Sequence, residues 1–333
     1  MTALSAEQVR AVPKIELHIH LEGTFRPSRV AELAGVVGEE PPRPVDRLFE
    51  VDNLADFLET LDWVCGLVRD EPTAEQVAYD FAAYAHDQGM VYAEVIVNPT
   101  HWSGLATGEL FTACARGFDR AQADGLGDFR LLPSILRQQS EQEARQLVEW
   151  IAGAGLPRIV GLSIDGNEEA AGRTGPRFAP AYADAARIGL GRTAHAGESS
   201  GAEGVRDAVE LLGVSRVDHG VRCIEDPEVL AMVLKRDITL NVCLTSNCTL
   251  LYSSLDDHPI RELAAAGVRF TINTDDPETL GISLCSEIQL AADYLGWSLG
   301  DLVAAQHRAI DAAFCSDADR QALRALVDQT VGT

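Results

Sequence analysis

Short apolar runs alternate with amphipathic, helix-like stretches along most of the chain. Eight such runs, rich in Val, Ile and Leu, begin at Lys14, Val91, Phe129, Arg158, Gly191, Arg216, Thr239 and Arg269. Between them, apolar residues recur at three- and four-residue spacing, as in the stretches that begin at Ser140, Phe178, Asp226 and His258. Regular alternation of strands and helices is typical of an α/β fold whose parallel strands are joined by crossover helices.

Eight strand and helix units favour a closed (β/α)8 TIM barrel, formed as a single domain over residues 1–333. The alternative is an open, doubly wound sheet, which is disfavoured because no G-x-G-x-x-G motif follows the first strand. The interval from His20 to Val91 is too long for one unit. We expect it to fold as extra helices over the C-terminal mouth of the barrel, with the segment from Asp52 as its most apolar part. The segment after Leu280 is expected to form closing helices.

The composition limits the partners that this protein can have. The 333 residues carry a formal net charge of -24, which repels nucleic acid phosphates and anionic membrane surfaces. No apolar stretch approaches the length of a membrane span, and the first residues lack the pattern of a signal peptide. The seven cysteines form no C-x-x-C pair, which argues against a disulfide framework and against a thiolate zinc site. We therefore expect a cytoplasmic monomer or homodimer that acts on a small molecule.

The first apolar run, KIELHIH, holds two histidines that are two residues apart. In a strand such residues point to the same face, so the imidazoles of His18 and His20 converge on one spot. Converging imidazoles indicate a metal ion. The alternative is a pair of half-buried polar side chains that are hydrogen-bonded to neighbouring backbone groups.

Polar residues gather at the C-terminal ends of the expected strands, where the chemistry of such barrels takes place. Besides the two histidines, these ends carry Gly166-Asn167-Glu168, His195 and Glu198, Asp218-His219-Gly220, and Asp275-Asp276. Each has another explanation when taken singly, since an acidic pair can cap the following helix. Five strand ends at one barrel mouth favour a shared site. Imidazole and carboxylate suit zinc or another first-row divalent ion, and such an ion lowers the pKa of bound water from 15.7 to about 7, which predicts a hydrolase.

The motifs HxHLEG, HAGE, DHG and NTDDP, in this order on successive expected strands, resemble those of the adenosine deaminase family of the amidohydrolase superfamily. The resemblance covers essentially the whole chain. It implies that one zinc ion is bound by His18, His20, His195 and Asp275. Its hydroxide would attack C6 of an aminopurine, and the resulting intermediate would release ammonia.

The resemblance also implies roles for the other polar residues. Glu198 would protonate ring N1, and His219 would orient the metal-bound water and accept its proton. Asp276 would hydrogen-bond N7, the backbone N–H of Gly166 would reach N3, and Glu22 would contact the ribose 5′-hydroxyl. The chemistry supports this in part, because C6 becomes electrophilic only if N1 takes a proton as hydroxide adds.

Three departures from the family pattern bear on the substrate. The chain has Glu22 in HLEG where adenosine deaminases often have HLDG, GNE around Asn167 in place of GDE, and DHG around His219 in place of GHG, a form associated with adenine deaminases. The expected substrate is adenosine or a close adenine nucleoside, and the alternative is free adenine or a modified nucleoside such as 6-aminodeoxyfutalosine.

Two other kinds of protein are less compatible with the sequence. A catalytically silent barrel that only binds purines or a protein predicts the loss of a ligand or acid, and none is missing. A two-metal hydrolase with a bridging carboxylated lysine is excluded, because the lysines are only Lys14, at the start of the first strand, and Lys235, in a helix.

The remaining candidates receive structural interpretations. Four histidines are placed in helix or loop positions without a catalytic role, namely His86, His101, His258 and His307. Trp102 either lines the pocket or packs in the core, and Asn247 is expected to fix a turn rather than to touch substrate.

Overall fold

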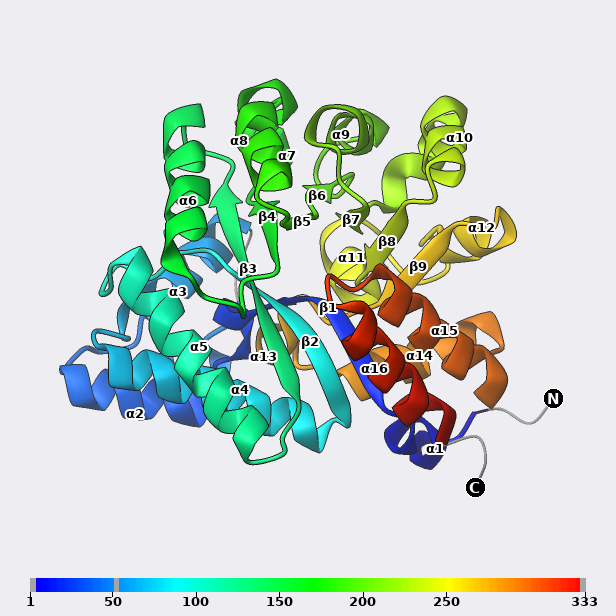
Figure 1. Ribbon diagram of the computed structural model, residues 1–333. Helices are drawn as coiled ribbons and strands as arrows, with labels where there is room; N and C mark the ends of the chain where they lie inside the picture. The colour runs from blue at the N-terminus through cyan, green and yellow to red at the C-terminus, as the bar shows by residue number, and fades with distance from the viewer. Residues whose placement is uncertain (1–3, 51–53, 330–333) are drawn as a thin grey trace.

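The computed structural model describes residues 4–50 and 54–329, and its parallel strands form the predicted (β/α)8 barrel (Figure 1). The strands are β1 Lys14–His20, β2 Met90–Val97, β3 Asp128–Leu136, β4 Gly161–Asp165, β5 Gly191–Arg192, β6 His195–Ala196, β7 Arg216–His219, β8 Thr239–Val242 and β9 Arg269–Ile272. The eight expected strands are all present. The fifth is interrupted at Thr193 and Ala194, so it is divided into β5 and β6.

Backbone hydrogen bonds close the wall of the barrel at two seams between the sheets β1-β2-β3-β4-β5 and β6-β7-β8-β9. At the first seam, the N–H of Thr193 donates to the carbonyl oxygen of Leu162 at 3.0 Å. At the second, the N–H of His20 donates to the carbonyl oxygen of Asp275 at 2.9 Å, and the N–H of Asp275 donates to that of His18 at 3.1 Å. The segment after β9 is therefore held against β1, and the open-sheet alternative is wrong.

Helices surround this wall, as expected (Figure 1). They are α1 Ala6–Ala11, α2 Pro27–Val37, α3 Leu54–Gly66, α4 Glu71–Asp87, α5 Thr107–Ala123, α6 Glu141–Ala154, α7 Glu168–Ala171, α8 Gly175–Arg187, α9 Ala202–Asp207, α10 Pro227–Lys235, α11 Leu244–Leu250, α12 Ile260–Ala265, α13 Pro277–Leu280, α14 Leu284–Leu295, α15 Leu299–Ala312 and α16 Asp317–Gln329. Shorter turns are η1 Leu21–Thr24, η2 Val45–Arg47, η3 Ala208–Leu212 and η4 Val221–Glu225.

Capping residues explain where the predicted helices begin. Ser140 accepts a hydrogen bond from the N–H of Glu143, whose carboxylate in turn accepts one from the N–H of Ser140, and this capping box starts α6. Asp226 caps α10 by accepting hydrogen bonds from the N–H groups of Glu228 and Val229, just before Pro227 at the first helical position. The helix-like stretches read from the sequence correspond to α6, α8, α10 and α12.

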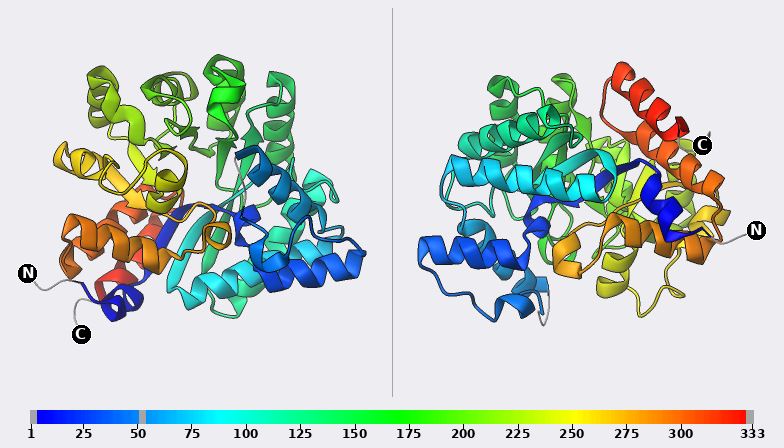
Figure 2. Two further views of the ribbon diagram at one scale, coloured as in Figure 1. Left: turned by 180° about the vertical axis from the view of Figure 1, so that it is seen from behind. Right: turned by 90° about the horizontal axis from the view of Figure 1, so that it is seen from below.

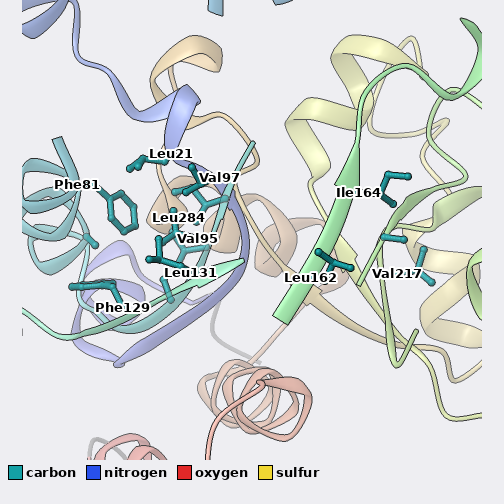
Figure 3. Close-up of a cluster of buried hydrophobic side chains, with 14 of the residues drawn as sticks. Leu21, Phe81, Val95, Val97, Phe129, Leu131, Leu162, Ile164, Val217 and Leu284 are labelled. Carbon is teal, nitrogen blue, oxygen red and sulfur yellow. The ribbon is translucent and has the colours of Figure 1, made fainter. Parts of the chain in front are cut away.

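The alternation of β1 sorts its side chains between two environments. Ile15 and Leu17 point outwards, where they pack on α15 and α16 with Ile310 and Val327. His18 and His20, on the opposite face, point into the barrel. On neighbouring strands, apolar side chains pack outwards in the same manner, as Val95 and Val97 do beside Phe81 of α4 (Figure 3). The histidines of β1 therefore lie inside the barrel because the apolar residues that alternate with them pack against helices.

The segment between β1 and α4 forms the expected extra helices, α2 and α3. Its apolar side chains cover the cavity at the barrel mouth, including Phe57, Leu58 and Leu61 of α3 and Phe49 just before it. Asp52, the first residue of the predicted apolar segment, lies outside the described residues. The closing helices α14 to α16 are also confirmed, and Figure 2 shows α16 on the same side of the molecule as α1.

Two sequence-based exclusions can be compared with the structure. Within residues 4–50 and 54–329, no helix combines the length and the apolarity that crossing a bilayer requires. All seven cysteines are free thiols, so the structure contains no disulfide framework, and the sequence predicted none.

Candidate active site

Four of the predicted metal ligands come together at the mouth of the barrel. The Nε2 atom of His18 lies 3.0 Å from Oδ1 of Asp275. The Nε2 atom of His20 lies 3.4 Å from the same oxygen and 3.0 Å from Nε2 of His195. In a tetrahedral zinc site with bonds of 2.0–2.2 Å, the ligand atoms are about 3.3 Å apart. The donor atoms thus have the spacing that a metal ion requires.

His219 lies beside this group as a fifth side chain. One ligating atom from each of His18, His195, His219 and Asp275 falls within 4.8 Å of the others, so His219 is near enough to belong to the metal centre. Its Nε2 atom is 3.9 Å from Oδ2 of Asp275, however, and not beside the Oδ1 atom that faces His18 and His20. The shorter distances favour the set of ligands that the sequence predicted.

The protonation of the histidines also suits a metal site. Burial lowers the pKa of His20 and His195, and the neighbouring His18 lowers that of His195 further. Both imidazoles are therefore neutral, which is the form that binds a metal. Burial acts in the same direction on His18, but Asp218 and Asp275 raise its pKa well above the ordinary value. Metal binding at His18 would release a proton.

Asp218 supports two of these histidines from behind. This fully buried carboxylate lies 3.1 Å from Nδ1 of His18 and 3.6 Å from Nδ1 of His195, and it accepts hydrogen bonds from Asn241 and Ser163. Although burial raises the pKa of Asp218, the charge of His18 holds it well below the usual range. A carboxylate behind a histidine ligand fixes the ring and its tautomer.

Unusual backbone geometry turns two of the polar side chains into the mouth. His219 and Asp275 have φ angles of 60° and 67°, in the left-handed region that residues other than glycine rarely adopt. Each such residue costs roughly 1–3 kcal/mol, and such residues cluster at functional sites. His219 is the last residue of β7, and Asp275 lies three residues after the end of β9.

Glu198 is held beside the predicted metal ligands by the carboxylate of Glu168. Its backbone N–H donates to Oε2 of Glu168 at 2.9 Å, and the neighbouring Ser200 hydroxyl donates to Oε1 of Glu168 at 2.7 Å. The side chain of Glu198 is 15% exposed, and its Oε1 atom lies 3.3 Å from Nε2 of His219. Burial, opposed by the nearby His219, raises the pKa of Glu198, which favours a protonated acid.

Asp276 faces the cavity and does not cap a helix. It precedes α13, but its side chain makes no capping hydrogen bond, and Oδ1 is buried without a hydrogen-bond partner among the described residues. Burial and the adjacent Asp275 raise the pKa of Asp276 well above its usual range. A Cβ atom on Gly23 would lie 2.0 Å from this Oδ1 atom, so the glycine of HLEG makes room for Asp276.

Glu22 is tied down on one side only. Its Oε1 atom accepts hydrogen bonds from Nε1 of Trp102 at 2.7 Å and from the backbone N–H of Asn98 at 2.8 Å. Its Oε2 atom is buried and has no hydrogen-bond partner in the part of the chain described. Burial raises the pKa of Glu22 to about 7. Trp102 is fully buried and packs against Phe25, so it supports Glu22 from the core and is absent from the cavity wall.

A cavity of about 500 Å³ connects these groups. Its wall includes Gly166, whose φ angle of 94° favours glycine, together with Asp165 and the apolar side chains of α3. His101 lies in the loop after β2, as predicted, and it also lines this cavity, with its Nδ1 atom 2.5 Å from Oδ1 of Asp62. Although burial opposes it, Asp62 raises the pKa of His101 to about 9.

The structure brings the predicted site residues together, and it adds supporting residues that the sequence did not indicate. All the predicted site residues border the cavity except His18, which lies beneath it, and they are His20, Glu22, Gly166, His195, Glu198, His219, Asp275 and Asp276. The roles of Asp218, Glu168 and Asn98 were missed. The first two stood inside quoted motifs, whereas nothing in the sequence marked Asn98. His86 is exposed and His307 pairs with Asp328, far along the chain.

Comparison with known sequences supports a relationship along nearly the whole chain. Residues 13–330 match the sequence model described as Adenosine deaminase. The chain belongs to the adenosine deaminase family. Membership confirms the resemblance drawn from the motifs and the predicted reaction class, which is hydrolytic deamination at a carbon–nitrogen bond.

Individual members of the family agree with this. The chain is 36% identical over 306 residues to an aminodeoxyfutalosine deaminase from Acidothermus cellulolyticus, covering 88% of this chain and 85% of that one. The structure of an adenine deaminase from Arthrobacter aurescens superposes with a TM-score of 0.90 at 28% identity, covering 97% of this chain and all of that one. A zinc-bound amidohydrolase from Burkholderia ambifaria superposes with a TM-score of 0.89 at 28% identity, covering 100% and 97%.

Proposed function

We propose that the protein is a zinc-dependent deaminase that hydrolyses the 6-amino group of adenosine or a close adenine nucleoside, within a single barrel domain. The observation that carries the proposal is the composition of one cavity. The cluster of three histidines and Asp275 adjoins Glu198. Two further carboxyl groups, of Glu22 and Asp276, each keep one buried oxygen that has no hydrogen-bond partner among the residues that the structure describes. A ligand with several nitrogen and hydroxyl groups would satisfy those oxygens.

The residues that would hold the zinc ion are His18, His20, His195 and Asp275. When bound, zinc would make hydroxide available at neutral pH, because it lowers the pKa of water from 15.7 to about 7. The spacing of the donor atoms and the neutral state of His20 and His195 support this assignment. The zinc-bound relative from Burkholderia ambifaria supports the identity of the metal.

The side chains of the cavity would activate the purine ring. Glu198, protonated because it is buried among other carboxylates, gives its proton to N1 as water adds to C6. His219 orients the water from its position beside Glu198. Asp276 hydrogen-bonds N7, and the backbone N–H of Gly166 donates to N3. Addition of one water and loss of one ammonia gives the 6-oxo product.

Size and charge of the cavity favour a nucleoside without phosphate groups. A volume of about 500 Å³ lies within the range of roughly 300–1,000 Å³ that encloses a drug-sized ligand. Among the described residues that line it there is no lysine or arginine, and six are acidic, namely Glu22, Glu50, Asp165, Glu198, Asp275 and Asp276. A phosphate group would find no guanidinium or ammonium group among these lining residues to neutralise it. The unpartnered Oε2 atom of Glu22 would accept a hydrogen bond from a sugar hydroxyl.

The alternative substrates are free adenine and a modified nucleoside such as 6-aminodeoxyfutalosine. The apolar wall formed by Phe49, Phe57 and Leu58 supports the second of these, since it would cover an apolar substituent on the sugar. The similarity to the aminodeoxyfutalosine deaminase from Acidothermus cellulolyticus points the same way.

A comparison of substrates tests the proposal. The zinc-loaded protein is assayed for ammonia release and ultraviolet change with adenosine, 2′-deoxyadenosine, adenine, 6-aminodeoxyfutalosine and AMP. We expect kcat/KM to be highest for a nucleoside and lowest for AMP. The variant Glu22→Gln serves as a matched probe, and it should lower kcat/KM for nucleosides more than for adenine. Highest turnover of AMP, or no turnover of any aminopurine by metal-loaded protein, would reject the proposal.

A further inference from the structure

A chain of hydrogen bonds leads from the start of α12 to His219. The backbone N–H of Ile260 donates to Nδ1 of His258 at 3.1 Å. Nε2 of His258 lies 3.3 Å from Oδ1 of Asn247, and Nδ2 of Asn247 lies 3.0 Å from Nδ1 of His219. The three side chains are buried, with exposures of 0–2%. Neither His258 nor Asn247 had a catalytic role in the expectations from sequence.

The backbone N–H of Ile260, where this series of hydrogen bonds begins, determines which atom donates and which accepts in each of the others. A backbone N–H can only donate, so Nδ1 of His258 is an acceptor and the proton of the neutral ring is on Nε2. That proton is donated to Oδ1 of Asn247. The amide nitrogen of Asn247 must then face His219 and donate to its Nδ1 atom. A neutral His219 consequently carries its own proton on Nε2.

The environment of His258 supports its neutral state. Burial lowers the pKa of His258 to about 4, and its ring packs edge-on against Tyr252 at a centroid distance of 5.2 Å. At the other end of this series of hydrogen bonds, Nε2 of His219 is buried at the cavity wall and faces Oε1 of Glu198 at 3.3 Å. The series of hydrogen bonds therefore ends in the Nε2–H group of His219, at the wall of the cavity.

We propose that His258 and Asn247 are positioning residues that fix His219 as the Nε2–H tautomer, so that His219 donates a hydrogen bond to the oxygen that attacks the substrate. The inference rests on the proposed deaminase function and changes one part of it. The sequence-based expectation was that His219 accepts the proton of the water. A ring that already carries a proton on Nε2 stabilises negative charge on that oxygen instead.

Glu198 can then carry all the protons of the reaction. It first gives its proton to N1, and the carboxylate that results takes a proton from water as the oxygen adds to C6. That proton passes to the leaving amino group, which departs as ammonia. The remaining hydroxyl proton on C6 returns to Glu198 as the carbonyl forms, so Glu198 ends in its starting state. In this sequence of steps His219 contributes a hydrogen bond and transfers no proton.

The tautomer can be read directly by nitrogen NMR of the zinc-loaded protein with 15N-labelled histidine, because protonated and unprotonated ring nitrogens differ widely in chemical shift. The His219 signals are assigned from their loss in His219→Gln. We expect Nε2 to be protonated in the wild type. In Asn247→Asp, which keeps the size of the side chain, the carboxylate can only accept, so the proton should move to Nδ1.

Kinetics of the same variants separate this role from a purely structural one. Asn247→Asp should lower kcat about 10²-fold, as does the loss of one donor to a developing oxyanion, while KM changes little. His258→Gln can still donate to Asn247, so it should keep the Nε2–H signal of His219 and most of kcat. The matched control is His86→Gln in α4, where the histidine is exposed.

Two results would overturn the inference: an Nδ1–H signal for His219 in the wild type, or an unmoved proton in folded Asn247→Asp. If Asn247→Asp does not fold, His258→Leu replaces it, and an unchanged single tautomer there would also overturn it. The NMR spectrum reports the tautomer of His219 whether or not the protein deaminates adenosine. Failure of the wild-type protein in the substrate assay would therefore reject the deaminase proposal without deciding the tautomer.

Discussion

Replacement of Asp218 by asparagine is expected to weaken metal binding without touching a metal ligand. Oδ1 of Asp218 accepts a hydrogen bond from Asn241 at 2.7 Å and lies 3.1 Å from Nδ1 of His18. Oδ2 accepts a hydrogen bond from Ser163 at 3.3 Å and lies 3.6 Å from Nδ1 of His195. An asparagine would turn one of these acceptors into a donor, so a donor would meet a donor in either orientation. Loss of such a supporting group costs about 10–100-fold in metal affinity, or about 1.4–2.7 kcal/mol.

Because one of the two histidines then faces a donor where it had an acceptor, we expect a loss within this range for Asp218→Asn. Zinc affinity is measured at constant pH by competition with a chromophoric chelator. Asp87→Asn is the matched control, because Asp87 is exposed at the end of α4 and remote from the site. Circular dichroism establishes that both variants fold. Wild-type zinc affinity in folded Asp218→Asn would refute the reasoning that the buried carboxylate orients the two rings.

Three further outcomes are expected. Glu198→Gln should retain zinc but lose about 10²–10⁴-fold in kcat, measured by ammonia release, and undiminished turnover would contradict its role as the acid. Glu94→Ala should lower the free energy of unfolding by about 3–5 kcal/mol, measured by urea unfolding. The reason is that the buried guanidinium of Arg216 loses the carboxylate that lies 2.6 Å away. An unchanged urea midpoint would argue against a structural ion pair. Burial lowers the pKa of His258 to about 4. Below a pH of about 6.5 the unfolded chain therefore takes up a proton that the folded protein does not, and the protein becomes less stable as the pH decreases. At pH 5 this loss amounts to about 2 kcal/mol, and urea unfolding should show it in the wild type but not in His258→Gln.

The fold was predictable because the barrel repeats one simple pattern. Each strand is a short apolar run, and most helices are marked by caps such as Ser140 and Asp226. The division of the fifth strand was not predictable, because it depends on which backbone groups of Thr193 and Ala194 find partners on neighbouring strands. Pairing of this kind is a property of the closed wall and leaves no mark on the local sequence.

The centre of the site could be predicted for a similar reason. His18, His195 and Asp275 stand at strand ends, and the closure of a barrel brings all strand ends together. His101 and His258 could not be assigned, because each comes from a loop whose path depends on tertiary contacts. The ring of His101 reaches the cavity from the loop after β2 and pairs with Asp62 of α3. Only the folded chain shows that His258 lies behind Asn247.

The left-handed backbone conformation of His219 and Asp275 places the stability of the fold in conflict with the chemistry of the site. Glycine adopts these φ angles without strain, so replacing either residue by glycine relieves local strain in the metal-free protein. The same replacement removes an imidazole or a carboxylate from the mouth of the barrel. Selection for thermal resistance alone would therefore favour the loss of these two side chains, and their presence in the chain records selection for what they do.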